Sequence, residues 1–213
     1  MQDYAKAIYT LETRDGTVST TALAERLDVR AASVSGMLRK LAALGLVAHE
    51  RYHGVTLTDR GRLVALEVIR HHRLLELFLV ESLGMSWDEV HAEAEVLEHV
   101  LSEDLEELIA AKLGDPKLDP HGDPIPSREL TIADDEARAL YDLEPGRRVT
   151  FVRVSDADPE MLRFLAERGI VPGARLEVIE RQPFDVPLYV RAGDEVHVLG
   201  ATLARAMRVS EKT

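Results

Sequence analysis

The spacing of the apolar residues changes near residue 144 of this chain of 213 residues, and the change constrains the fold more than any other feature. As far as residue 113, and apart from a short segment at residues 46–57, apolar side chains recur at intervals of three and four residues, which is typical of amphipathic helices. From residue 144 they alternate with polar side chains, as in strands that bury one face. The chain is therefore expected to be mainly α-helical, with a smaller β part near its C-terminal end.

The first 62 residues have the pattern of a winged helix-turn-helix domain. Helices are expected over residues 2–12, 19–27 and 32–44, with Ser19 or Thr20 as N-cap of the second and Gly45 ending the third. Residues 46–57 read as a β-hairpin. Two short helices, a tight turn and a hairpin predict DNA binding, although a purely structural unit or a module for protein contacts has the same pattern.

The third of these helices is expected to lie in the major groove of DNA, with its N-terminal residues at the base edges. Small residues there allow the backbone to approach DNA closely, and basic residues one turn later suit phosphate contacts. In the hairpin, Arg51 and His53 are placed to reach the DNA backbone or the minor groove. The residues expected at DNA are Arg30, Ala32, Ser33, Ser35, Gly36, Arg39, Lys40 and Arg51.

The net charge of −12 argues against nucleic-acid binding by the chain as a whole, but its distribution does not. Residues 1–62 carry 9 Lys and Arg against 7 Asp and Glu, whereas residues 63–213 carry 17 against 31. A local positive field at the first domain is compatible with an acidic remainder. That remainder is rich in the oxygen ligands that hard divalent cations prefer.

Residues 63–128 are expected to form a second, helical domain. A long helix over residues 59–83 ends at Gly84, and Ser86 with Glu89 forms a capping box that opens the next helix. A further helix is expected over residues 102–113, followed by an extended, proline-rich linker over 115–128 and a short helix over 131–139. Residues 129–213 would hold the end of this linker and a small β-barrel, with strands near 149–154, 176–179, 187–190 and 195–198, and a helix over 160–167.

Histidines and carboxylates gather at helical spacing in the second domain. His72 and Glu76 share one helix face, and His91, Glu95, Glu98 and His99 form a polar stripe beside an apolar one. Such a group is costly near a buried surface unless a cation neutralises it, which predicts a metal site. A solvated acidic helix face is the alternative interpretation. The chain has no cysteine, so thiolate ligands and disulfides are excluded.

The start of the chain lacks the features of a secretory signal, and no apolar run is long enough to span a bilayer. A cytoplasmic protein without membrane contact is the simplest expectation.

Several motifs together resemble the diphtheria-toxin-repressor family of metal-dependent transcriptional regulators, especially its manganese-responsive branch. The resemblance extends over nearly the whole chain, and its two most specific segments are Glu98-His99-Val100 and Pro120-His121-Gly122-x-Pro124-Ile125-Pro126. The other segments are Asp3-Tyr4-x-x-Ala7-Ile8-Tyr9, the helix before Gly45-Leu46-Val47, Leu57-Thr58-x-x-Gly61, His72-Arg73-Leu74-x-Glu76, His91-x-Glu93-Ala94-Glu95 and Gly169-Ile170-Val171-Pro172-Gly173.

The resemblance implies a homodimer that binds double-stranded operator DNA when loaded with metal and represses metal-uptake genes. It implies an SH3-like third domain, with Mn²⁺ as the cofactor and Fe²⁺ as the alternative. Two metal sites follow from it, one made of Asp3, His72, Glu95, Glu98 and His99, and another made of Glu76, Asp119, His121 and Asp156. Asp158 is an alternative to Asp156, and His91 belongs to an ancillary site in iron-responsive relatives.

The chain departs from the family pattern at two positions. Asp119 stands where related proteins often have cysteine, which makes the second site richer in oxygen. Lys6 stands where some two-domain manganese sensors carry an acid, so their binuclear arrangement is not expected here.

Other classes of function fit the sequence less well. A carboxylate-bridged di-metal enzyme would need paired Glu-x-x-His motifs, which the metal-binding stripe lacks. A winged-helix regulator that senses an organic ligand would leave the histidine and glutamate stripe without a role. An accessory protein for metal transport would not need a basic recognition helix.

Overall fold

A computed structural model describes residues 1–50, 54–132, 136–156, 158–181 and 187–211. The chain divides into two compact units. The first contains residues 1–72, 98–101 and 126–131, and the second contains residues 73–97, 102–125 and 132–213. Arg51 and His53, which were expected at DNA, lie outside the described residues.

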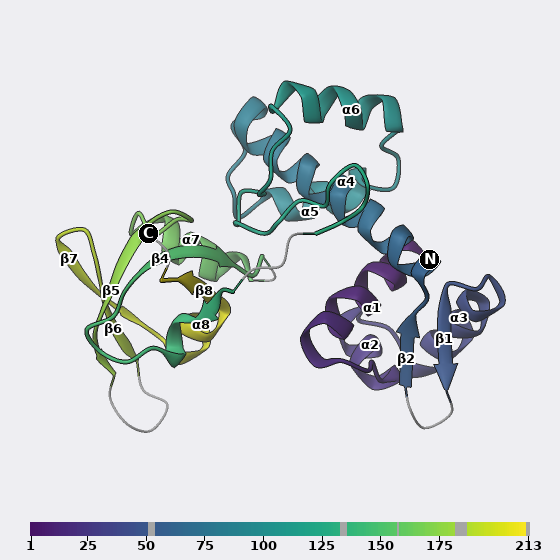
Figure 1. Cartoon of the computed structure of the whole chain (residues 1–213), viewed down its shortest axis with the longest axis horizontal. Helices are drawn as coiled ribbons and strands as arrows, with labels where there is room; N and C mark the ends of the chain where they lie inside the picture. Colours follow the sequence, from purple (N-terminus) through teal and green to yellow (C-terminus); the bar gives the residue numbers. More distant parts are fainter. Residues whose placement is uncertain (51–53, 133–135, 157, 182–186, 212–213) are drawn as a thin grey trace. The chain divides into compact units, whose positions relative to one another are not determined.

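The first unit contains the predicted winged helix-turn-helix (Figure 1). Helices α1 (Gln2–Asp15), α2 (Thr20–Arg26) and α3 (Ala31–Ala43) are followed by the antiparallel strands β1 (Val47–Glu50) and β2 (Gly54–Leu57). The side chain of Ser19 accepts a hydrogen bond from the amide of Ala22 and caps α2, as the sequence predicts. The helices pack around a core that includes Ile8, Leu23 and Leu41, all fully buried.

A close backbone contact joins the hairpin to helix α4 (Asp59–Leu83). A Cβ atom at Gly61 would lie 1.9 Å from the carbonyl oxygen of Leu46, so only glycine fits in this first turn. The hydroxyl of Thr58 donates to the carbonyl of Gly45 and accepts from the amide of Gly61. Gly45 itself has a φ of 69°, which explains why helix α3 ends there.

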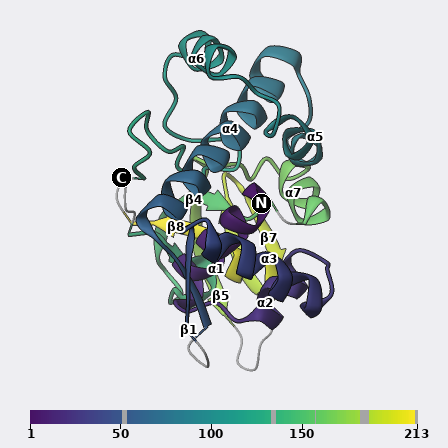
Figure 2. The same cartoon turned by 90° about the vertical axis from the view of Figure 1, so that its right-hand side faces the viewer.

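The later part of α4 belongs to the second unit, which also contains α5 (Val90–Leu97) and α6 (Glu103–Lys112) (Figures 1 and 2). The expected capping box at Ser86 is wrong. The Ser86 hydroxyl bonds to the carboxylate of Asp88, and residues 87–89 form turns before α5 begins. Helix α5 is also shorter than the polar stripe suggests, because it ends at Leu97 and Glu98 and His99 follow in a turn.

The second unit ends in an antiparallel sheet with strand order β3-β8-β4-β5-β6-β7. Its strands are β3 (Arg138–Ala139), β4 (Arg148–Val154), β5 (Arg175–Arg181), β6 (Leu188–Ala192), β7 (Glu195–Leu199) and β8 (Met207–Ser210). The four predicted strands and the helix α7 (Pro159–Ala166) are confirmed. A 3₁₀ turn (Leu140–Asp142), helix α8 (Ala201–Ala206), β3 and β8 were not predicted.

The sheet domain has its own core, which contains Phe151, Leu162, Ile170, Leu188 and Leu199, all fully buried. The short helix expected over residues 131–139 is wrong at its end, because residues 138 and 139 pair with β8 as a strand. The rest of that segment includes residues 133–135, which lie outside the described residues. No helix in the described part of the chain is both long and apolar enough to cross a membrane.

Candidate metal centres and DNA-facing helix

Three expected ligands, Asp3, Glu98 and His99, come together in the first unit, and we call them the first cluster. Asp3 lies in the first turn of α1, and the other two lie in the turn after α5. The Nε2 atom of His99 is 2.8 Å from Oδ1 of Asp3 and 3.7 Å from Oε1 of Glu98. One imidazole nitrogen and two carboxylate oxygens therefore face one point, and this donor set suits Mn²⁺ or Fe²⁺.

The other oxygen of Glu98 faces Lys6 and His72. The Nζ atom of Lys6 donates to Oε2 of Glu98 at 2.7 Å, and Nδ1 of His72 lies 2.5 Å from the same oxygen. Burial raises the pKa of Glu98, but the hydrogen bond with His72 and the positive charge of Lys6 outweigh it, and the pKa lies below its usual value. Glu98 is therefore held as a carboxylate although it is almost completely buried.

In the second unit, the carboxylate of Glu76 lies between two imidazoles. Its Oε1 is 3.2 Å from Nδ1 of His91, and its Oε2 is 3.7 Å from Nδ1 of His121. Two aspartates complete this arrangement. Oδ2 of Asp156 lies 2.9 Å from Nδ1 of His91, and Asp119 groups with Glu76 and His121. We call Glu76, His91, Asp119, His121 and Asp156 the second cluster.

His121 is oriented as a metal ligand would be. Its Nε2 donates to the carbonyl of Trp87 at 2.7 Å, and its ring stacks on Trp87 with centroids 5.7 Å apart. The Nδ1 atom is fully buried, makes no hydrogen bond among the described residues and faces Glu76. Metal-bound histidines usually donate their other ring nitrogen to a carbonyl or carboxylate in this way, so the residues present fit a bound cation.

Asp119 is positioned by its own loop. Its Oδ1 accepts hydrogen bonds from the amides of His121 and Asp123, and its Oδ2 lies 3.5 Å from Nε of Arg73. Burial, together with the charges of Asp123 and Glu76, raises the pKa of Asp119 to about 7. A cation bound beside Asp119 would stabilise the charged form of this carboxyl.

The two aspartates after β4 differ in their contacts. Asp156 lies beside His91, whereas the side chain of Asp158 accepts hydrogen bonds from the amides of Glu160 and Met161 and caps α7. The alternative in which Asp158 replaces Asp156 therefore has no support in the geometry. Hydrogen bonds to Asp156 and Glu76 raise the pKa of His91 to about 10, despite partial burial.

Glu95 does not group with Asp3, Glu98 and His99 among the described residues. Its side chain is 58% exposed and lies 3.7 Å from Nε2 of His91, one helical turn away. The expectation from the sequence also missed Lys6, Trp87 and Arg73 as partners of candidate ligands. The spacing of Asp3 and Lys6, three residues apart on α1, was the one available signal for Lys6.

The residues expected at DNA lie along the exposed side of α3, apart from Arg51. The helix begins after Arg30, whose side chain makes no capping hydrogen bond. A Cβ atom at Gly36 would meet nothing within 4 Å, so this face of the helix is open. Arg30, Ala32, Ser33, Ser35, Arg39 and Lys40 are exposed and Gly36 is partly exposed.

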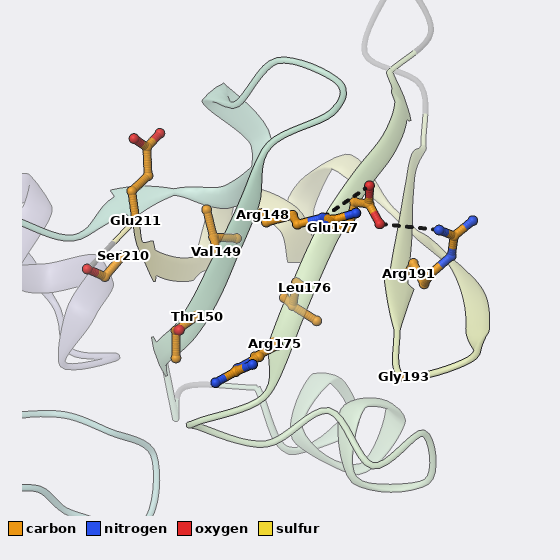
Figure 3. A pocket seen from close by; sticks show the side chains of 10 residues that line it. All are labelled: Arg148, Val149, Thr150, Arg175, Leu176, Glu177, Arg191, Gly193, Ser210 and Glu211. Atoms are coloured by element: carbon orange, nitrogen blue, oxygen red, sulfur yellow. Dashed lines mark hydrogen bonds and ion pairs between the residues drawn. The ribbon is translucent and has the colours of Figure 1, made fainter. Parts of the chain in front are cut away.

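A pocket of about 400 Å³ lies in the sheet domain, lined by residues of β4, β5, β6 and β8 and by their neighbours (Figure 3). Figure 3 shows Arg148 and Arg191 reaching Glu177 from opposite sides. The pocket contains none of the candidate metal ligands.

Comparison with known protein families finds matches along most of the chain. Residues 1–55 match the N-terminal DNA-binding domain of iron-dependent repressors, and residues 58–127 match the metal-binding and dimerisation domain of the same proteins. Residues 138–211 match the FeoA domain.

Individual relatives cover almost the full length. The chain is 36% identical to the iron-dependent repressor IdeR of Mycobacterium tuberculosis over 98% of this chain and 95% of that protein. A solved manganese-dependent transcriptional repressor in complex with manganese is 47% identical, with a TM-score of 0.91 and 98% of each chain covered. The manganese regulator SloR is 31% identical, with a TM-score of 0.81 over 99% of this chain and 98% of that one.

Proposed function

The chain belongs to the iron-dependent repressor family of metal-dependent, DNA-binding transcriptional repressors, and from this premise we propose that it represses metal-uptake genes when it binds Mn²⁺. The family consists of repressors and not of enzymes, which removes the di-metal enzyme as a rival.

Mn²⁺ is the proposed cofactor because the candidate ligands are carboxylates and imidazoles without sulfur. A similar solved repressor carries manganese, and Fe²⁺ remains the alternative because the similar mycobacterial protein is named iron-dependent. The first cluster, with His72 and Glu95 as further candidates, would hold one ion. The second cluster would hold another. A bound ion would supply positive charge that neutralises the carboxylates of each cluster.

One observation carries the proposal. Asp3 belongs to the segment that matches a DNA-binding domain, whereas Glu98 and His99 belong to the segment that matches a metal-binding domain. Each of the three offers a ligand atom, and these atoms lie within 4.8 Å of one another. A cation held by both segments would fix α1 against the turn after α5. A hundredfold effect of metal on DNA affinity would require a coupling free energy of about 2.7 kcal/mol.

The proposed partner is double-stranded operator DNA, bound by a homodimer. Large apolar side chains of the helical domain support dimerisation, because Val96, Leu105 and Leu108 are largely exposed. Two copies of α3 would then read two half-sites about 34 Å apart or at a multiple of that distance. Because a repressor acts at the chromosome, we place the protein in the cytoplasm.

We propose domain limits at residues 1–62 for the DNA-binding domain, 63–128 for the metal-binding and dimerisation domain, and 129–213 for the linker and SH3-like domain. The family matches end close to these limits.

The test is DNA binding by fluorescence anisotropy, on the upstream region of the protein's own operon, with Mn²⁺, Fe²⁺, Zn²⁺ or chelator. Mn²⁺ should raise the affinity about a hundredfold. Asp3→Ala should abolish this increase, whereas Glu103→Ala, which removes an exposed carboxylate outside both clusters, should retain it. An Asp3→Ala protein that responds to Mn²⁺ as strongly as the wild type would refute the mechanism.

A further inference from the structure

A lysine side chain is built into the first cluster. Lys6 lies on α1, one turn after Asp3, and its side chain is only 17% exposed. Its ammonium lies 2.7 Å from Oε2 of Glu98 and 3.1 Å from Nδ1 of His72. The ammonium is thus surrounded by a carboxylate oxygen and an imidazole nitrogen. The first cluster offers the same kinds of atom to a metal ion, from Asp3, Glu98 and His99.

The two oxygens of Glu98 therefore face two cation positions. Oε1 faces the site formed with Asp3 and His99, which can accept an external ion. Oε2 faces the ammonium of Lys6, which is covalently part of the chain. Because the Glu98 side chain is only 2% exposed, water screens neither interaction well.

We propose that Lys6 is an internal cation of the metal site, which shares the carboxylate of Glu98 with the bound metal and thereby lowers the affinity of the first cluster. The proposal rests on the function proposed above. Lys6 stabilises Glu98 before metal arrives, and it repels the divalent ion afterwards. It therefore raises the metal concentration at which the protein would become a repressor.

A count of charges agrees with this role. In the first cluster as the structure shows it, without Glu95, Asp3 and Glu98 together carry two negative charges, which a divalent ion would neutralise completely. With Lys6 present, the same ion leaves one positive charge in excess. Like charges a few ångströms apart in a poorly screened site oppose one another strongly, so removal of the lysine charge should favour the metal.

The experiment compares Lys6→Met with the wild type in two measurements. The first is Mn²⁺ affinity, by competition with a metal-binding dye in the full-length protein. The second is the thermal unfolding midpoint in chelator. We expect Lys6→Met to bind Mn²⁺ at least about tenfold more tightly and to unfold at a lower temperature in chelator, because Glu98 has then lost one of its two partners and keeps only His72.

Three further variants isolate the charge. Lys6→Gln can keep a hydrogen bond to Glu98 without the charge, and it should also bind Mn²⁺ more tightly. It serves as the test if Lys6→Met does not fold without metal. Lys6→Arg keeps the charge and should resemble the wild type. Lys112→Met removes an exposed positive charge on α6 and should change neither measurement.

The outcomes separate the two proposals. A wild-type protein that binds no Mn²⁺ would refute the proposed function. A wild-type protein that binds Mn²⁺, with Lys6→Met and Lys6→Gln binding it equally or more weakly, would refute only the role of Lys6. A purely structural lysine would lower the unfolding temperature without raising the affinity.

Discussion

Glu76 presents each of its carboxylate oxygens to a different imidazole, and neither imidazole behaves like a free histidine. The hydrogen bonds of His91 to Asp156 and Glu76 raise its pKa to about 10. Burial lowers the pKa of His121, but Glu76 and Asp119 raise it to about 9 overall. At neutral pH both rings are therefore protonated when no metal is present. A metal ion that binds their Nδ1 atoms has to displace these protons.

This arrangement predicts opposite effects of pH on stability with and without metal. Unfolded histidines have a pKa of about 6.5, so between that value and about 9 to 10 the metal-free folded protein binds more protons than the unfolded chain. The stability that these two histidines contribute should be fully present below pH 6.5 and fall as the pH rises through this window. The metal-loaded protein should become more stable over the same window, because deprotonated ligands bind metal better. Thermal unfolding between pH 6.5 and 9.5, with excess Mn²⁺ or chelator, measures both slopes.

His121→Asn should flatten both slopes, because it removes one of the two histidines with a raised pKa. A metal-free protein whose unfolding temperature rises between pH 7 and 9 would contradict the assignment.

At the scale of elements, two aspartates just before the N-terminus of α7 make different contacts. Asp158 caps the helix by accepting hydrogen bonds from two amides, and Asp156 lies beside His91 two residues earlier. A helix cap contributes to folding, while a ligand contributes to metal binding. The two substitutions should therefore affect different measurements.

We predict that Asp158→Ala lowers the free energy of unfolding by about 1 kcal/mol and leaves Mn²⁺ affinity unchanged. Asp156→Asn should weaken Mn²⁺ binding to the second cluster. It leaves the cap of α7 intact, because Asp158 provides that cap. Calorimetric titration and chemical denaturation of both variants provide the comparison. If Asp158→Ala weakens metal binding as much as Asp156→Asn does, the assignment of the two roles is wrong.

The elements themselves were largely predictable, because their signals are local. Ser19 and Gly45 mark helix ends by capping rules that depend on neighbouring residues. Local rules failed at Ser86, whose hydroxyl bonds to Asp88 instead of capping a helix. They also failed at α8 and β8, where a six-residue helix leads directly into a four-residue strand. Such short elements carry too little periodicity to be recognised.

The candidate site was predictable in its residue types and less so in its contacts. Histidines and carboxylates at helical spacing identified His72, Glu76, His91 and His99 as candidate ligands. The contact of Lys6 with Glu98 joins residues 92 positions apart, and that of His121 with Trp87 joins residues 34 apart. Neither contact leaves a mark in the local sequence, because tertiary packing alone brings these residues together.

At the scale of the whole molecule, the proposed function requires a dimer of two chains. Helix α6 carries Leu105 and Leu108 with 48% and 68% of their surface exposed. Neither is fully covered within the described chain, which is expected of an interface residue before assembly. The energetic centre of such an interface usually lies in a few apolar residues.

We predict that Leu108→Glu converts the dimer to a monomer, because a buried, unpaired carboxylate is costly in an apolar interface. Sedimentation velocity with Mn²⁺ present should show the change, and affinity for a two-half-site operator should fall with it. Val171→Glu, which places the same charge on an exposed valine of the sheet domain, should remain dimeric. A Leu108→Glu protein that sediments as the wild type does would exclude α6 from the interface.

Trp87 is the only tryptophan of the chain, and its indole stacks on the imidazole of His121. A protonated imidazole quenches the light emitted by a neighbouring indole, whereas a neutral ring does so much less. The protein therefore carries an optical reporter beside the second cluster. Its fluorescence should brighten when Zn²⁺, which does not itself quench by paramagnetism, displaces the proton of His121, so that filling of this cluster can be followed without a label.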